Sequence, residues 1–123
     1  MRLLIDTHIL VWIALNDSRL SKAQRDALGD SDNAIVFGPA TAYELTQLQK
    51  LGMIPLKEPI SKLQELIGFE TVDLPFGIWT EAAKLPDIHR DPIDRMLIAH
   101  ARLERMTLVT ADAKIRRYPV DFV

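Results

Sequence analysis

The sequence predicts an α/β fold: a three-layer α/β/α sandwich built on a central parallel sheet of four to five strands. Short apolar segments with the character of strands alternate with helical segments, and this order gives a parallel sheet with helices on both faces. The first segment, residues 2–5, is a nearly continuous apolar run, as expected for a buried parallel strand. A length of 123 residues predicts one domain, residues 1–123, large enough for a core of its own.

The expected elements follow from apolar spacing and from turn residues between the segments. The expected strands are residues 2–5, 34–37, 69–74 and 107–110, with residues 120–122 as a short edge strand. The expected helices are residues 9–15, 21–28, 40–51, 60–67, 75–85 and 92–105, with a turn or short helix at residues 112–116. Gly52, Gly68 and Pro86 each follow a helical segment and are typical of helix ends.

The composition excludes several kinds of chemistry. The chain has no cysteine, so disulfides, thiolate metal sites and thiol nucleophiles are excluded, and a cytoplasmic location is expected. No apolar run approaches the length of a membrane span and no signal peptide is recognisable, so no membrane association is expected. The net charge of −2 argues against nucleic-acid binding by bulk positive charge, although residues 84–123 hold 8 Lys and Arg against 6 Asp and Glu.

The most informative stretch is residues 89–101, which reads His-Arg-Asp-Pro-Ile-Asp-Arg-Met-Leu-Ile-Ala-His-Ala. Its apolar spacing predicts a core helix, with Asp91 and Asp94 in the first turn. Capping alone explains this pattern: Asp91 suits the N-cap, Pro92 the first helical position and Asp94 the reciprocal acid of a capping box. Asp91 could also pair with Arg95 on the helix surface. A functional interpretation requires other acids at the same place.

Three further acids are expected near this helix end. Ligands of open parallel sheets bind at the carboxyl ends of the strands, where Asp6 follows the first strand and Asp112 the fourth. If these strands are neighbours, both carboxylates and Asp94 reach the same edge. Glu44 lies among apolar residues of the helix after the second strand, which is costly unless the acid is paired or bound to a metal. Each acid also has a simpler explanation, as a cap or as a solvated side chain.

A cluster of four carboxylates favours a hard divalent cation, Mg²⁺ with Mn²⁺ as a substitute. Such ions support attack of a metal-activated water on a phosphodiester. The hydroxyls of Thr7 and Thr110 stand beside Asp6 and Asp112 and are expected to orient these carboxylates.

The histidines and glycines indicate no other chemistry. Each of the three histidines is expected to be a satisfied structural residue; they are His8, His89 and His100. The glycines stand singly, so a phosphate-binding loop is unsupported.

Four motifs occur in order along nearly the whole chain. They are Leu-Leu-Ile-Asp-Thr-His at 3–8, Ala-Thr-Ala-Tyr-Glu-Leu at 40–45, the stretch 89–101 and Leu-Val-Thr-Ala-Asp at 108–112. With these motifs the chain resembles the PIN-domain ribonucleases of the VapC toxin family, the toxic half of type II toxin–antitoxin pairs. The resemblance places the catalytic and metal-binding positions on Asp6, Glu44, Asp94 and Asp112, and it makes Asp91 a secondary candidate.

The resemblance implies Mg²⁺-dependent endonucleolytic cleavage of RNA by a PIN-like fold. It also implies a homodimer and a cognate VapB-like antitoxin whose tail blocks the site. Arg90 and Arg95 would then contact substrate phosphate or hold the carboxylates in place, while a surface salt bridge explains them equally well.

Three other functions are compatible with parts of the pattern. A receiver domain of a signalling protein also has an acidic Mg²⁺ pocket, but it needs an acidic pair after the first strand, where Asp6 is followed by Thr7. A PIN domain that acts only as a binding module is disfavoured by the intact acids. A PIN nuclease of RNA processing, outside any toxin pair, would lack a small antitoxin gene immediately upstream.

Overall fold

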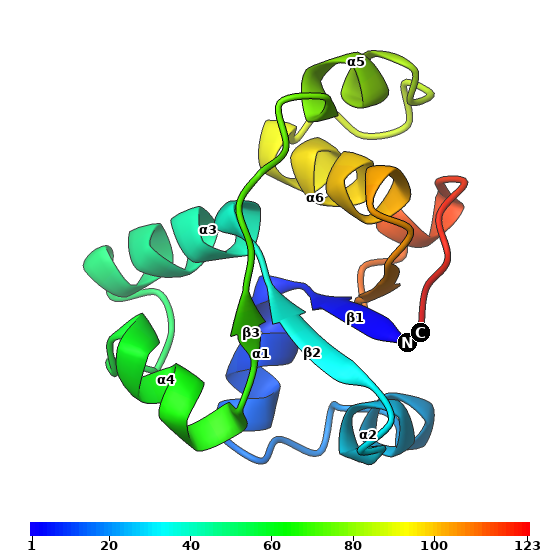
Figure 1. Ribbon diagram of the computed structural model, residues 1–123. Helices are drawn as coiled ribbons and strands as arrows, with labels where there is room; N and C mark the ends of the chain where they lie inside the picture. Colours follow the sequence, from blue (N-terminus) through cyan, green and yellow to red (C-terminus); the bar gives the residue numbers. More distant parts are fainter.

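The sheet has four parallel strands in the order β3-β2-β1-β4 (Figure 1). The computed structural model describes residues 1–123, and its strands are β1 (Arg2–Ile5), β2 (Ala34–Phe37), β3 (Glu70–Thr71) and β4 (Thr107–Val109). Strand β1 pairs with β2 on one side and with β4 on the other. The predicted α/β class, the parallel sheet and the condition that the first and fourth strands are neighbours are confirmed.

Helices connect the strands and cover both faces of the sheet. They are α1 (Thr7–Ala14), α2 (Lys22–Gly29), α3 (Pro39–Lys50), α4 (Ile60–Ile67), α5 (Ile78–Ala83), α6 (Pro92–Leu103) and a 3-10 turn, η1 (Ile115–Arg117). Their ends follow from local sequence: Ser21 and Gln24 form a capping box at α2, and Gly68 ends α4 with a positive φ of 82°. None of these helices is both long and apolar enough to cross a membrane.

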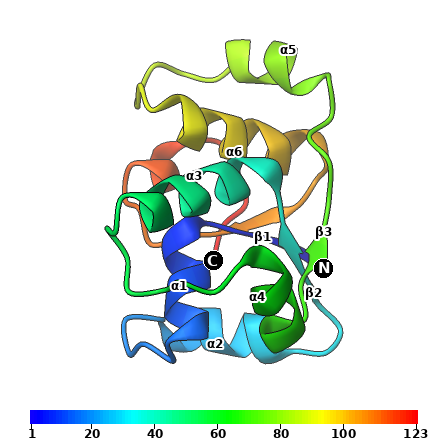
Figure 2. The same cartoon turned by 90° about the vertical axis from the view of Figure 1, so that its left-hand side faces the viewer.

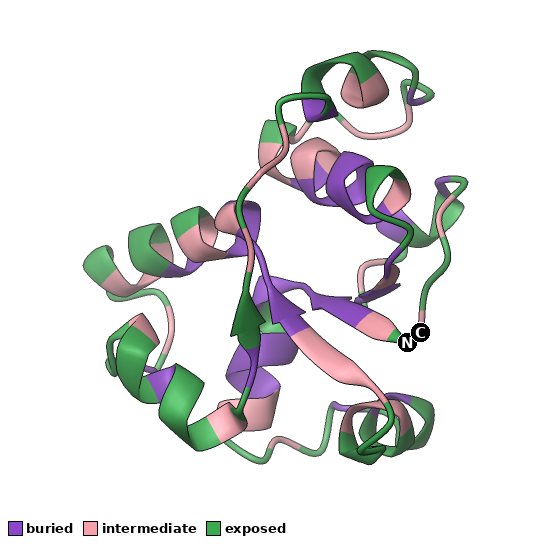
Figure 3. Ribbon diagram, viewed as in Figure 1, coloured by how far each residue is buried: buried purple, intermediate pink, exposed green.

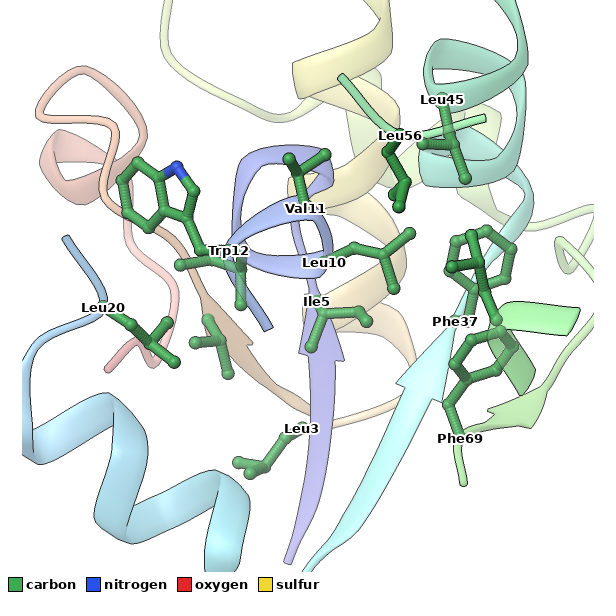
Figure 4. Packing of buried hydrophobic residues seen from close by; sticks show 13 residues of the cluster. Leu3, Ile5, Leu10, Val11, Trp12, Leu20, Phe37, Leu45, Leu56 and Phe69 are labelled. Atoms are coloured by element: carbon green, nitrogen blue, oxygen red, sulfur yellow. The ribbon is translucent and has the colours of Figure 1, made fainter. Parts of the chain in front are cut away.

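One face of the sheet packs against α1 and α4. Because side chains alternate along a strand, Leu3 and Ile5 of β1 point to this face, where Leu10 of α1 joins them (Figure 4). Phe37 of β2 stacks on Phe69 next to β3, with ring centroids 4.7 Å apart. This cluster fixes α1, and with it the end of β1, in the middle of the molecule.

The opposite face packs against α6, and α5 covers the outer side of α6 (Figure 2). Leu4 of β1 and Leu108 of β4 meet Ile98 of α6 in a second core cluster. Helices α1 and α6 are buried over most of their length, whereas α2 and α4 are mostly exposed (Figure 3). The two helices that have aspartates as N-caps, Asp6 at α1 and Asp91 at α6, are thus the most deeply buried helices of the fold.

The third predicted strand and the edge strand are shorter than expected. Residues 69–74 form a strand only at Glu70–Thr71; the Val72 amide still donates to the Phe37 carbonyl at 3.4 Å, and its side chain packs against the second core cluster. Residues 120–122 contribute a single bridge, between Phe122 and Leu108. The two segments lie at opposite edges of the sheet, where only one neighbouring strand fixes each of them.

The predicted fifth helix is also shorter, spanning Ile78–Ala83 instead of residues 75–85. Residues 75–77 form the preceding turn, in which the Ile78 amide donates to the Pro75 carbonyl at 3.1 Å. After α5 the chain has no regular structure until α6. This irregular segment, residues 84–91, carries part of the site described next.

Candidate active site

Four of the acids named above converge at the carboxyl ends of the strands in two groups, and Asp6 lies outside both groups but close enough for its charge to act on Asp94. One group contains Glu44, Asp91 and Asp94, each with an oxygen within 4.8 Å of the others. A second contains His89, Asp94 and Asp112 within the same distance. Asp94 belongs to both groups and therefore lies at the centre of the cluster.

Asp6 follows β1 and forms the N-cap of α1. The interpretation of this residue as a helix cap is therefore confirmed, but capping is not its only contact. Its carboxylate accepts the Thr7 amide at 2.6 Å and the Thr110 hydroxyl at 2.7 Å, and the residue is only 6% exposed. Burial raises the pKa of the Asp6 carboxyl above its usual value. The Thr110 hydrogen bond opposes this rise, and the negative charge of Glu44 adds to it. Capping thus leaves Asp6 facing other acids.

Thr110 joins the two acids at the strand ends. Its hydroxyl donates to Asp6 and accepts the Asp112 amide at 3.1 Å. Its carbonyl accepts from Gln24 at 3.1 Å and from Arg116 Nη2 at 2.8 Å, so the residue is fixed from both sides. The Thr110 hydroxyl donates to a carboxylate, as predicted, but this carboxylate belongs to Asp6 and not to the neighbouring Asp112. Thr7 contacts Asp6 through its backbone amide, where its hydroxyl was predicted to do so.

Asp91 caps α6, accepting the Ile93 amide at 2.9 Å and the Asp94 amide at 3.3 Å. The Asp94 carboxylate does not complete a capping box. It lies 2.6 Å from His89 Nε2 instead, and the residue is 9% exposed. Burial raises the pKa of Asp94 to about 6, against the effect of the His89 hydrogen bond and with the help of nearby negative charge from Asp91, Asp6 and Glu44.

Glu44 reaches the cluster from the second turn of α3 and is half-buried. The first turn of α3 is fastened to the end of β1, because the Thr41 hydroxyl donates to the Ile5 carbonyl at 2.7 Å. Thr41 lies one helical turn before Glu44, so the two side chains share a face of α3. This contact places Glu44 beside the end of β1. The alternative explanation of Glu44 as a fully solvated side chain is therefore wrong.

Asp112 lies in the loop after β4 and is half-buried. Its carboxylate accepts the Lys114 amide at 2.8 Å, so it also caps the turn that follows. A cavity of about 250 Å³ opens beside it, lined by Asp6, His8, Trp12, Ala111 and Asp112. A larger cavity of about 630 Å³ lies near the carboxyl end of α6, and none of the four acids lines it. The smaller cavity, which two of these acids line, is therefore the candidate active-site cavity.

The two arginines of the central stretch differ. Arg90 is exposed next to the acids. Arg95 forms no salt bridge with Asp91: its guanidinium donates to the carbonyls of Pro86 at 3.0 Å and of Ala82 at 3.1 Å. The possible surface pair between Asp91 and Arg95 does not form, because backbone carbonyls at the end of α5 and in the segment before α6 accept from the Arg95 guanidinium instead.

Two histidines also depart from expectation. His89 was expected to be a satisfied structural residue, and its Nε2 does have a partner, but this partner is Asp94, so the imidazole lies among the acids. A signal was present in the sequence, since His89 stands two residues before the N-cap of α6 and can fold back over the first turn. His100 was expected to be satisfied, but its Nδ1 is buried without a hydrogen-bond partner.

The donor set suits a hard divalent cation. Apart from His89, the converging groups are carboxylates, and oxygen ligands are those that Mg²⁺ and Mn²⁺ prefer. Burial is the main cause of the raised pKa of Asp94, and the negative charges of Asp91, Asp6 and Glu44 add to it, so the acids also repel one another in the absence of positive charge. A bound cation would remove this repulsion, so the residues present fit a metal site.

The sequence and structure of this region match known proteins. Residues 3–121 match the PIN domain family. Ribonuclease VapC22 of Mycobacterium tuberculosis is 31% identical over 118 residues, which are 94% of this chain and 90% of that protein. The chain is a PIN domain of the VapC family. The acidic cluster found here is typical of the metal-binding site of PIN domains.

Solved structures share the fold of this VapC-like chain over its whole length. VapBC2 of Rickettsia felis, solved with a DNA fragment from its promoter, aligns with a TM-score of 0.73 at 20% identity, covering 100% of this chain and 98% of that one. VapBC-1 of nontypeable Haemophilus influenzae aligns with a TM-score of 0.68 at 17% identity, covering 100% and 97%. At these identities the likeness concerns the fold alone.

Proposed function

We propose that this VapC-like chain is a Mg²⁺-dependent endoribonuclease and the toxin of a type II toxin–antitoxin pair. The observation that carries the proposal is the convergence of Asp6, Glu44, Asp94 and Asp112 on one end of the sheet from four separate elements. Helix capping explains Asp6 and Asp112, but it does not explain why Glu44 and Asp94 face them. The ribonuclease name of the curated relative supports RNA as the substrate.

In the proposed reaction the four carboxylates hold Mg²⁺ or Mn²⁺ and define where the scissile phosphate lies. When bound, the ion supplies the activation of water and the charge neutralisation that phosphodiester hydrolysis needs. Thr110 keeps Asp6 and Asp112 at a fixed separation through its hydroxyl. Asp91 holds the first turn of α6 and adds negative charge next to Asp94.

The surroundings of the acids fit an RNA backbone. Arg90 is exposed beside the cluster and is the arginine of the central stretch that is free to contact phosphate. The guanidinium of Arg95 is held by backbone carbonyls, and its proposed part is to support the loop. Since the ion and Arg90 together reverse the local charge, the modest net charge of −2 is compatible with RNA binding.

The proposed partners follow from the relatives. The solved structures described above are VapBC assemblies, which supports a VapB-like antitoxin for this chain. We also propose a homodimer, which the resemblance to the VapC family implies. We propose that residues 1–123 act as one domain in the cytoplasm. Co-expression with the product of an adjacent small gene, followed by size-exclusion chromatography, tests the pair. A chain that stays free of that product would favour a nuclease outside any toxin pair.

The test of the nuclease is cleavage of a panel of structured RNAs by the purified chain in Mg²⁺, in Mn²⁺ and in EDTA. Asp94→Asn serves as the inactive variant and Asp121→Asn, an exposed acid outside the cluster, as the matched control. Cuts that need the ion, persist in Asp121→Asn and disappear in Asp94→Asn are expected. Cuts that persist in EDTA and in Asp94→Asn would refute the proposal.

A further inference from the structure

We propose that His89 and Tyr118 are positioning residues for the candidate metal site. In this arrangement the His89 imidazole donates a hydrogen bond that orients the Asp94 carboxylate, and the Tyr118 hydroxyl fixes the backbone that carries His89. The inference rests on the proposed metal-dependent function and adds two residues that lie outside its four carboxylates.

The first contact is that between His89 and Asp94. Nε2 of His89 lies 2.6 Å from Oδ2 of Asp94, and the two side chains are 16% and 12% exposed. Asp91, Asp6 and Glu44 surround Asp94 with like charge. A donor at this distance keeps the carboxylate in one orientation, as hydrogen bonds to metal-binding side chains do.

The second contact explains why His89 stays in place although it belongs to no helix or strand. The Tyr118 hydroxyl accepts the His89 amide at 2.7 Å and donates to the His89 carbonyl at 3.2 Å. Tyr118 is only 3% exposed and follows η1 in the second core cluster. A single buried hydroxyl therefore fixes both backbone groups of His89.

Arg95 completes this support. Its Nη1 donates to the Tyr118 hydroxyl at 3.3 Å and to the His89 carbonyl at 3.4 Å, and its Nη2 donates to Ala82 and Leu85 carbonyls. The loop before α6 is thereby tied both to α5 and to the segment after β4. Residues far apart in the sequence thus determine where the His89 imidazole lies.

A different role for His89 is that of a direct metal ligand. Its imidazole is close enough to Asp94 and Asp112 to bind the same ion as these carboxylates. However, Nε2 is the nitrogen that faces the acids, and its short contact with Asp94 uses the direction along which it would bind an ion. The hydrogen bond favours positioning, and Mn²⁺ allows the two roles to be separated.

The experiment measures the Mn²⁺ affinity of the full chain without RNA, by the electron paramagnetic resonance signal of free Mn²⁺. His89→Ala is expected to lower the affinity about 10-fold or more, the usual effect of losing a hydrogen bond to a metal ligand. His89→Gln keeps an N–H donor and is expected to retain affinity within about 3-fold. Tyr118→Phe is expected to lower the affinity in the wild-type chain and to have no further effect in His89→Ala, because it acts through His89.

A buried control separates this effect from general loss of stability. Ile115→Val removes one methylene from the core cluster that also contains Tyr118, and Ile115 belongs to neither group of side chains that could hold the ion, so Mn²⁺ affinity is expected to be unchanged. Equal affinity of His89→Ala and wild type would overturn the inference. So would an equal loss from Tyr118→Phe with and without His89.

Two further outcomes concern the nature of the site. Nitrogen coupling to bound Mn²⁺ that is lost in His89→Ala would identify a direct ligand and overturn the positioning role. If wild type and Asp94→Asn bind Mn²⁺ equally, the proposed metal site itself fails along with the inference. If Asp94→Asn loses Mn²⁺ affinity while the His89 and Tyr118 variants bind as wild type does, the metal site stands and the inference alone fails.

Discussion

Asp6 and Asp94 both lie in the first turn of a buried helix, yet different parts of the molecule hold their carboxylates. Asp6 accepts hydrogen bonds from Thr7 and Thr110, which belong to α1 and to the end of β4. Asp94 accepts one from His89, in a segment without regular structure, and is surrounded by three other acids. The strand side of the site is therefore built by the sheet itself, whereas the helix side depends on a loop and, as we propose, on a cation.

The largest expected effect comes from removing charge on the helix side. Glu44→Gln keeps the shape of the side chain but removes one of the proposed ligands. Loss of several kcal/mol of charge stabilisation corresponds to a decrease in RNA cleavage of about 100-fold or more. Single-turnover cleavage rates in Mg²⁺ check this prediction.

Glu58→Gln, at an exposed position, is the matched control for Glu44→Gln. It should leave cleavage unchanged. Without metal, Glu44→Gln should unfold at a slightly higher temperature than its control, because the charge that it removes repels Asp6 and Asp94. A Glu44→Gln protein that cleaves RNA at the rate of its control would remove Glu44 from the proposed site.

On the strand side, a substitution that removes a hydrogen bond is expected to change the free energy of unfolding and leaves the charge of the site unaltered. Thr110→Val keeps the shape of a fully buried side chain and removes the hydroxyl that serves Asp6 and Asp112. Leaving these buried groups unpaired should lower the free energy of unfolding by about 1–3 kcal/mol. Urea denaturation of the metal-free protein measures the change, with Thr80→Val at an exposed position as the control.

Asp94→Asn should act in the opposite direction and stabilise the metal-free protein. Asn removes a negative charge from among Asp91, Asp6 and Glu44 and still accepts a hydrogen bond from His89. The gain in the free energy of unfolding should be on the order of 1 kcal/mol at pH 7. Opposite signs for Thr110→Val and Asp94→Asn would confirm that the two sides differ; destabilisation by both would contradict it.

The pH dependence sharpens the same comparison. The pKa of Asp94 is raised from 3.8 to about 6 in the fold, so the folded chain holds this proton more tightly than the unfolded chain does. The stability contributed by protonated Asp94 is complete below pH 3.8 and is lost as the pH rises through about 6. This component should be absent in Asp94→Asn and reduced by Mg²⁺, as measured by unfolding between pH 4 and 7.

The sequence predicted the strand side of the site more fully than the helix side. Asp6 and Asp112 each follow an apolar strand, and parallel strands bring such positions to one edge of the sheet. The sequence indicated a carboxylate partner for the Thr110 hydroxyl, but the partner is Asp6 across the sheet and not the neighbouring Asp112. The predicted hydroxyl contact of Thr7 was wrong, because a residue directly after an N-cap offers its amide to the capping side chain.

The helix side was harder because its contacts are made by irregular backbone. Arg95 was expected to pair with an acid four residues away, but carbonyls of the loop before α6 hold it. His89 has no periodic neighbours from which its direction could be predicted. The part of Tyr118 depends on a contact between residues 29 positions apart, which no local pattern indicates.

The smallest expected effect concerns His100, whose environment resembles neither side of the site. It is 1% exposed in the core, its Nδ1 lacks a partner, and a Cβ on Gly38 would lie only 3.2 Å from that atom. Burial lowers the pKa of the His100 imidazole below 6.5. As the pH falls below 6.5, the unfolded chain therefore takes up a proton that the folded chain resists, and stability is lost.

His100→Leu should consequently change the free energy of unfolding at pH 7 by less than about 1 kcal/mol, because the buried nitrogen it removes has no partner. At pH 5 the variant should gain relative to wild type, since it has no imidazole to protonate on unfolding. Urea denaturation at both pH values checks this, and Asp94→Asn provides the contrast, because it removes a proton-linked component of opposite sign. A variant that loses equal stability at both pH values would show that His100 matters for packing alone.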